Sequence, residues 1–139
     1  MDYVSKTVKI QRPRQQVYDF FADFRELSHL VPPNQVSDLE TTEATCSFSV
    51  KPVGKVRLQI AYREPVKLIK YSSQEGDPLE FNLWVQLLEA TPYETRLRIT
   101  LRANFNTMIR ALLGRKLQKS VDEAALQIAA AFNAQTPLA

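Results

Sequence analysis

Few side chains of this sequence are suited to acid, base or nucleophilic chemistry, and His29 is the first to consider. It is the only histidine, and an imidazole titrates near neutral pH, as a general acid or base must. No partner stands at a recognisable spacing from it. One histidine and one cysteine also fall short of the three or four ligands that zinc takes in proteins. We therefore interpret His29 as a surface residue, and we predict no catalytic group, metal or cofactor.

Cys46 and Tyr62 both stand in runs where apolar and polar residues alternate. Cys46 shares a strand face with Phe48, and a buried thiol behaves as a small hydrophobic group. A nucleophilic thiol would need a basic neighbour, and the sequence places none beside it, so we assign Cys46 to the core. Tyr62 shares a face with Leu58 and Ile60, and an inward phenol needs a hydrogen-bond partner. For Tyr62, lining of a ligand cavity and plain packing both stay open.

The alternating runs predict the strands that would position these side chains. They cover residues 44–52, 55–63, 66–73, 79–90 and 95–105. The turns between successive runs are short, and short turns join antiparallel neighbours. The middle of the chain is therefore expected to form an antiparallel sheet with one apolar face.

Helical periodicity brackets this sheet on both sides. Residues 3–10 predict a short strand, and Pro13 then stands where a helix can begin. Apolar residues at helical spacing follow to Phe24, with a second short turn before residue 32. Residues 106–133 carry a broad apolar stripe with the helical period. The order predicts an α+β fold: a curved antiparallel sheet wrapped around a long C-terminal helix, with two short helices after the first strand.

Composition places the chain among soluble globular proteins. Its 139 residues are 45% hydrophobic and 24% charged, the size and composition of one domain, and we expect residues 134–139 to form a disordered tail. The net charge of +3 comes from basic residues interspersed with acidic ones, so we predict no nucleic-acid partner. No apolar run is long enough to span a membrane, and no signal peptide is recognisable. With a single cysteine, we expect a cytoplasmic protein.

Local motifs resemble the START-like, or Bet v 1-like, superfamily, also called SRPBCC or polyketide cyclase-like. The stretch "IQRPRQQVYDFFADFREL" is similar to the superfamily's opening, through Ile10, Pro13, Val17, Tyr18 and Asp23. The stretches "CSFSVKPVGKVRLQIAYREPVKLIKY" and "FNLWVQL" are similar to uncharacterised bacterial members. The resemblance covers about residues 3–132. It implies the helix-grip fold, in which the C-terminal helix lies in the sheet over a hydrophobic cavity.

The resemblance also implies a class of ligand. Members of the superfamily bind lipids, quinones, polyketides or plant hormones, and some are cyclases. This chain departs from the plant allergens, which carry a glycine-rich loop, since it has only three glycines. It also departs from the ring-hydroxylating oxygenases, which hold iron with two His and an Asp, since it has one His.

We therefore predict a binding domain for a small hydrophobic or amphipathic molecule, such as a lipid, quinone or polyketide-like compound, between the sheet and the C-terminal helix. The alternatives are a cyclase or dehydratase acting on a polyketide-like substrate, and an interaction module whose cavity is filled by its own side chains. Side-chain volumes do not decide between a lined pocket and a packed core. The predicted ligand-binding residues are Phe48, Leu58, Ile60, Tyr62, Phe81, Leu83, Leu97, Ile99, Met108, Leu112 and Leu117.

The opposite face of the sheet is predicted to be polar and basic. Strict alternation turns five arginines outward, and we interpret them as a solvated face with acidic cross-strand partners. Trp84 and Leu88 share this face, which makes a homodimer contact possible there. The five arginines are Arg57, Arg63, Arg96, Arg98 and Arg102.

Overall fold

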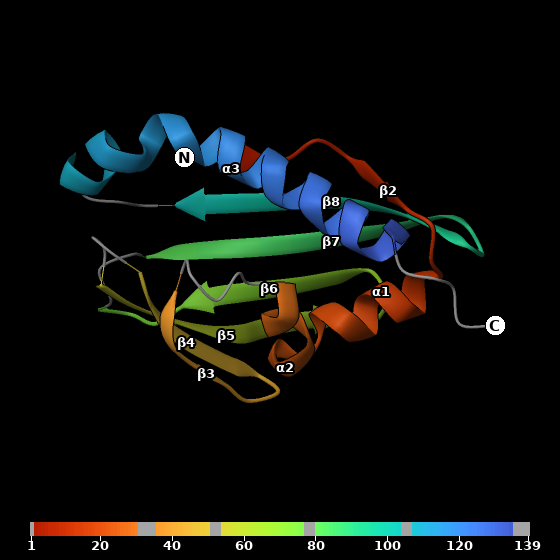
Figure 1. Ribbon diagram of the computed structural model, residues 1–139, viewed down its shortest axis with the longest axis horizontal. Coiled ribbons are helices and arrows are strands. Elements are labelled where there is room, and N and C mark those ends of the chain that lie inside the picture. Colours follow the sequence, from red (N-terminus) through yellow and green to blue (C-terminus); the bar gives the residue numbers. More distant parts are fainter. Residues whose placement is uncertain (1, 31–35, 51–53, 77–79, 104–106, 135–139) are drawn as a thin grey trace.

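The computed structural model describes residues 2–30, 36–50, 54–76, 80–103 and 107–134 (Figure 1). In these ranges eight strands form one antiparallel sheet in the order β1-β8-β7-β6-β5-β4-β3, with β2 also paired to β8. The strands are β1 Asp2–Val4, β2 Val8–Ile10, β3 Ser37–Thr41, β4 Thr45–Val50, β5 Gly54–Glu64, β6 Leu68–Ser73, β7 Phe81–Thr91 and β8 Glu94–Ala103.

The helices gather on one face of this sheet, which we call the inner face. They are α1 Arg14–Phe21, α2 Phe24–Leu27, the 3-10 turn η1 Ser28–Leu30 and α3 Thr107–Ala134. The long helix α3 packs against β1, β2 and β8, and α1 packs against β7 and β8; Figure 1 shows α3 running over β8. The predicted α+β helix-grip architecture is confirmed.

The local sequence explains where the first two helices begin. Pro13 directly precedes α1 with extended backbone angles, and its ring presets the φ of the chain at the helix start. Asp23 caps α2: its carboxylate accepts a hydrogen bond from the Arg25 backbone N–H at 2.9 Å. Asp23 also pairs with the Arg25 guanidinium, and these bonds lower the pKa of Asp23.

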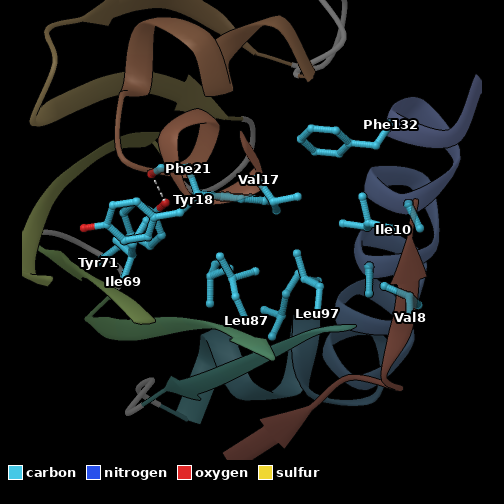
Figure 2. Close-up of a cluster of buried hydrophobic side chains, with 14 of the residues drawn as sticks. Val8, Ile10, Val17, Tyr18, Phe21, Ile69, Tyr71, Leu87, Leu97 and Phe132 are labelled. Carbon is cyan, nitrogen blue, oxygen red and sulfur yellow. Dashed lines mark hydrogen bonds between the residues drawn. The ribbon is translucent and has the colours of Figure 1, made fainter. Parts of the chain in front are cut away.

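The main core lies between α1, the end of α3 and the middle of the sheet. Figure 2 shows Val17 and Phe21 from α1 meeting Leu87 and Leu97 from the sheet, with Phe132 of α3 beside them. A smaller cluster, Leu101, Ala103 and Val121, sits where β8 ends under α3. Burial of these faces supplies the hydrophobic free energy that holds helices and sheet together.

A β-bulge in β5 overturns one sequence-based expectation. Ile60 pairs with Tyr71 but Tyr62 pairs with Lys70, so Ala61 is an extra residue that reverses the alternation. Tyr62 therefore faces away from the core and is 53% exposed, and its predicted inward orientation is wrong. Arg63 turns the other way and donates a hydrogen bond to the Ala22 carbonyl at 3.3 Å, so its predicted outward orientation is also wrong.

The first predicted strand is interrupted. The Ser5 hydroxyl accepts a hydrogen bond from the Ile99 backbone N–H at 2.9 Å, and residues 5–7 separate β1 from β2. Lys6 is exposed at this interruption, and its backbone N–H donates to Asp122 of α3 at 2.8 Å. The strand break thus spares the Lys6 charge from burial.

The edge strand β3 was not predicted from the sequence. Its residues are mostly exposed, so they show no alternation of apolar and polar residues. Ala134 ends α3, and the rest of the expected disordered tail lies outside the described residues. Over the described ranges, none of the helices has the length and hydropathy needed to cross a membrane.

Candidate functional site

The candidate site lies at the end of the inner face where β7 begins and β8 ends. Six apolar side chains there are half-buried, in contrast to the fully buried core beside them. We call them the half-buried set: Phe48, Leu58, Ile60, Phe81, Leu83 and Leu117.

Strand register brings the half-buried set together. Leu58 pairs with Cys46, and Phe48 follows two residues later on the same face of β4. On the next strands Ile60 pairs with Tyr71, and Tyr71 in turn pairs with Leu83. Leu83 contacts both core clusters, so the half-buried set occupies the boundary between them. All six belong to the predicted lining.

Other predicted lining residues fall elsewhere. Leu97 is 0% exposed and Ile99 is buried, so both form part of the packed core further along β8 from the half-buried set. Tyr62 points to the opposite face. The side chains of Met108 and Leu112 lie outside the described residues, although both belong to α3.

Two polar side chains of the inner face, those of Tyr71 and Ser73, form hydrogen bonds to the backbone. The Tyr71 hydroxyl donates to the Phe21 carbonyl at the end of α1 (dashed line in Figure 2). Burial raises the pKa of Tyr71 well above its usual value, and the charge of Arg63 offsets only part of this. The Ser73 hydroxyl accepts the Phe81 backbone N–H at 2.8 Å. These groups fix the backbone around the half-buried set.

Cys46 is buried, as expected for a core residue. Burial raises the pKa of its thiol, which lowers the thiolate fraction at neutral pH. The prediction that Cys46 packs as a small hydrophobic group is confirmed.

His29 is exposed, which confirms its interpretation as a surface residue. It lines a hollow of about 610 Å³ between α1, η1 and the end of α3, together with Asp19, Glu26, Phe20 and Phe132. Within the described ranges, no three His, Cys, Asp or Glu side chains gather as metal ligands.

Comparison with known proteins supports the fold. No protein-family model matches the chain, and none of the curated proteins matches it in sequence. Solved structures do match. Truncated norcoclaurine synthase from Thalictrum flavum superposes with a TM-score of 0.73 at 8% identity, covering 98% of this chain and 96% of that one.

Two further structures match over similar lengths. A START superfamily protein from Mycobacterium smegmatis gives a TM-score of 0.59 at 15% identity, covering 91% of this chain and 98% of that one. The Aha1 dimer from Colwellia psychrerythraea gives 0.64 at 14% identity, covering 99% of both chains. The chain therefore has the START-like, Bet v 1-like fold that its motifs predicted. At these identities the comparison concerns the fold alone.

Proposed function

We propose that this chain is a non-enzymatic, single-domain binding protein for a small apolar or amphipathic molecule, such as a lipid, quinone or polyketide-like compound. The ligand would lie on the half-buried set, between the inner face of the sheet and α3. The single observation that carries this proposal is that six apolar side chains from β4, β5, β7 and α3 stay half-buried together at one end of the inner face.

The physical basis is the apolar surface that a ligand would remove from water. Burial contributes roughly 25 cal/mol per Å² before the costs of association. Phe48 on β4 and Phe81 on β7 offer large flat side chains. Leu58 lies on β5, between these two strands, and Leu83 follows Phe81 on β7. A pocket of this kind is lined mainly by apolar groups, with a few polar groups that orient the ligand.

Binding is favoured over catalysis because the described inner face lacks a free acid–base pair. Tyr71 already donates its proton to the Phe21 carbonyl, and the raised pKa of Cys46 disfavours a nucleophile. General acid–base chemistry needs groups whose pKa values lie near the working pH. A cyclase or dehydratase would need such groups to reach the half-buried set.

Two further properties belong to the same proposal. A reduced single thiol fits the cytoplasm, where disulfides are rare. The Aha1 structure with a similar fold is a dimer. We propose that, if this chain dimerises, two copies meet on the outer face around Trp84 of β7, the other residue of the contact predicted from the sequence.

The test compares Leu58→Ala with Leu97→Ala for binding of N-phenyl-1-naphthylamine, an uncharged apolar fluorophore. Leu58 belongs to the half-buried set and Leu97 to the packed core. Weaker binding by Leu58→Ala alone is the expected result. Equal affinity of wild type and Leu58→Ala would refute the assignment.

A further inference from the structure

A second hollow, which we call the outer hollow, is lined mainly by outward-facing residues of the sheet and shares no residue with the half-buried set. At the end of the sheet it also reaches Arg14 of α1 and the buried Leu87. It measures about 500 Å³ and collects residues from five separate segments. Four of its side chains are cationic: Arg14 from the start of α1, Lys67 from the β5–β6 turn, and Arg96 and Arg98 from β8. One carboxylate, Glu64, lines it with them.

The bulge in β5 places Glu64, the carboxylate that lines this hollow. By shifting the alternation at Ala61, it turns Glu64 to the outer face, where Glu64 stands 3.9 Å from the Lys67 ammonium. Both side chains are about half exposed, so the pair is weak and solvent-screened. Arg96 has its own partner, with its Nε 3.2 Å from a Glu94 carboxylate oxygen.

Arg98 differs from its neighbours because its partner is neutral. Its Nε and one terminal nitrogen both donate to the Gln86 amide oxygen, at 2.9 and 2.6 Å. Two bonds to one oxygen orient the guanidinium, but an amide does not neutralise its charge. The remaining N–H groups of the planar fork are available to an anion.

Arg102, four residues further along the same face of β8, shows the contrast. It pairs across the sheet with Asp2, through bonds of 2.8 and 3.1 Å to the two carboxylate oxygens. Arg102 is therefore already matched by a carboxylate, as expected for a solvated outer face. Arg98 instead donates its two hydrogen bonds to the uncharged Gln86 amide, and it lies in a hollow with three other cationic side chains.

An apolar wall adjoins these charges. Leu68 and Leu87 line the hollow, and Leu88 is 67% exposed beside Arg96, its cross-strand partner. A ligand that fits both features carries an anion and an organic group. A phosphomonoester is close to dianionic at neutral pH and offers three acceptor oxygens, which suits several guanidinium and ammonium donors better than a single carboxylate does.

We propose that this outer hollow binds the phosphate of a phosphorylated small molecule, either free or as the headgroup of a lipid. Arg98 and Arg96 hold the phosphate oxygens from adjacent outward positions of β8, Lys67 and Arg14 add charge from the sides, and Leu88 contacts the organic group. The site is independent of the proposed inner-face ligand, because the outer hollow and the half-buried set have no lining residue in common.

The first test is a titration of the wild-type chain with glycerol 3-phosphate, followed by ¹⁵N–¹H NMR, with glycerol as the uncharged control. We expect amide shifts at residues 86–88 and 96–98 with glycerol 3-phosphate only. Absence of these shifts up to about 10 mM, a concentration that reveals millimolar affinity, would overturn the proposal.

The matched variants are Arg98→Gln and Arg102→Gln, which remove the same charge from the same strand face. Loss of charge-assisted hydrogen bonds predicts about tenfold weaker binding for Arg98→Gln. Arg102 stands four residues from Arg98, about 13 Å along the strand, beyond the Debye length of about 8 Å at physiological salt. Arg102→Gln should therefore change affinity less than about twofold. Equal losses in the two variants would overturn the proposal in favour of diffuse charge attraction.

Vesicles separate the two sources of phosphate. Sedimentation with phosphatidic acid in phosphatidylcholine, compared with phosphatidylcholine alone, reports binding to a lipid headgroup. If the wild type and Arg102→Gln bind phosphatidic acid and Arg98→Gln does not, the phosphate comes from a lipid headgroup. Binding of glycerol 3-phosphate without vesicle binding assigns the free molecule. Unfolding midpoints in urea confirm that both exposed substitutions leave the fold intact.

Discussion

Leu58 and Leu97 provide a direct comparison between site and core within one sheet face. Leu97 is fully buried, so Leu97→Ala removes three carbons from close packing and leaves a cavity. Such substitutions cost 2–5 kcal/mol in well-packed cores, and we expect about 3 kcal/mol here. Leu58 is half-buried and already partly in contact with water, so we expect Leu58→Ala to cost only about 1 kcal/mol.

Ligand affinity should respond in the opposite order. If Leu58 covers about 40 Å² of a bound probe, its loss at roughly 25 cal/mol per Å² weakens binding by about 1 kcal/mol, or about fivefold. Leu97 lies four residues along β8 from Leu101, the cross-strand partner of Leu83, and so lies away from the half-buried set. The cavity that Leu97→Ala creates is suited to a ligand of about benzene size, smaller than the two-ring-system naphthylamine probe. Its affinity for the probe should stay close to that of the wild type.

The assay needs two measurements on the same three proteins. Urea unfolding gives the free energies of unfolding, and fluorescence titration with N-phenyl-1-naphthylamine gives the affinities. Leu58→Ala should lose affinity with a small loss of stability, and Leu97→Ala should show the reverse. If Leu58→Ala loses as much stability as Leu97→Ala and binds the probe like the wild type, Leu58 is ordinary core and the site assignment fails.

Three further predictions concern two buried side chains, Tyr71 and Cys46. Tyr71→Phe leaves the Phe21 carbonyl without its buried donor and should lower the free energy of unfolding by about 1–3 kcal/mol, measured in urea; no measurable change would refute this role. The pKa of Tyr71 is raised in the folded state, so the neutral phenol stabilises the fold fully at pH values below about 10, the pKa of an unfolded tyrosine. This stabilisation is lost as the pH rises above about 10. The wild type should therefore lose stability above about pH 10 more steeply than Tyr71→Phe. Cys46, with its raised pKa and buried position, should react with iodoacetamide at pH 8 about tenfold or more slowly in the native chain than in urea, as followed by mass spectrometry. Equal rates would mean that the thiol is accessible.

The fold could be predicted from the sequence because most strands alternate without interruption. In β7 and β8 the inward positions, including Leu83, Leu97 and Ile99, follow strict period two, and the structure keeps them on one face. The long C-terminal helix was predicted for residues 106–133 and runs over Thr107–Ala134. These elements carry enough apolar surface for the pattern to specify both their type and their inward face.

Local irregularities escaped the same reasoning. The extra residue Ala61 leaves the alternating pattern intact as a sequence, yet it reverses the faces of Tyr62 and Arg63. Ser5 interrupts the first strand by bonding Ile99 through its side chain, which no periodicity shows. A bulge is a property of strand pairing, and pairing depends on residues far away in the sequence.

The candidate sites were accessible to prediction to different degrees. The half-buried set could be predicted because each member is an inward apolar residue of a regular element. The sequence could not predict which inward residues remain half-buried, because their exposure depends on where the two core clusters end. The outer hollow was missed because Arg14, Lys67 and Arg98 come from distant segments that only the folded chain assembles.

The central claim is that the inner face holds a small apolar molecule, and native mass spectrometry of the chain purified from cell extract tests it most directly. We expect a discrete added mass, released on denaturation and recovered in an organic extract, with lower occupancy in Leu58→Ala than in Leu97→Ala. The same spectrum reports monomer or dimer. A clean mass of the bare chain in all three proteins, with nothing recovered in the extract, would mean that the inner face holds no such molecule.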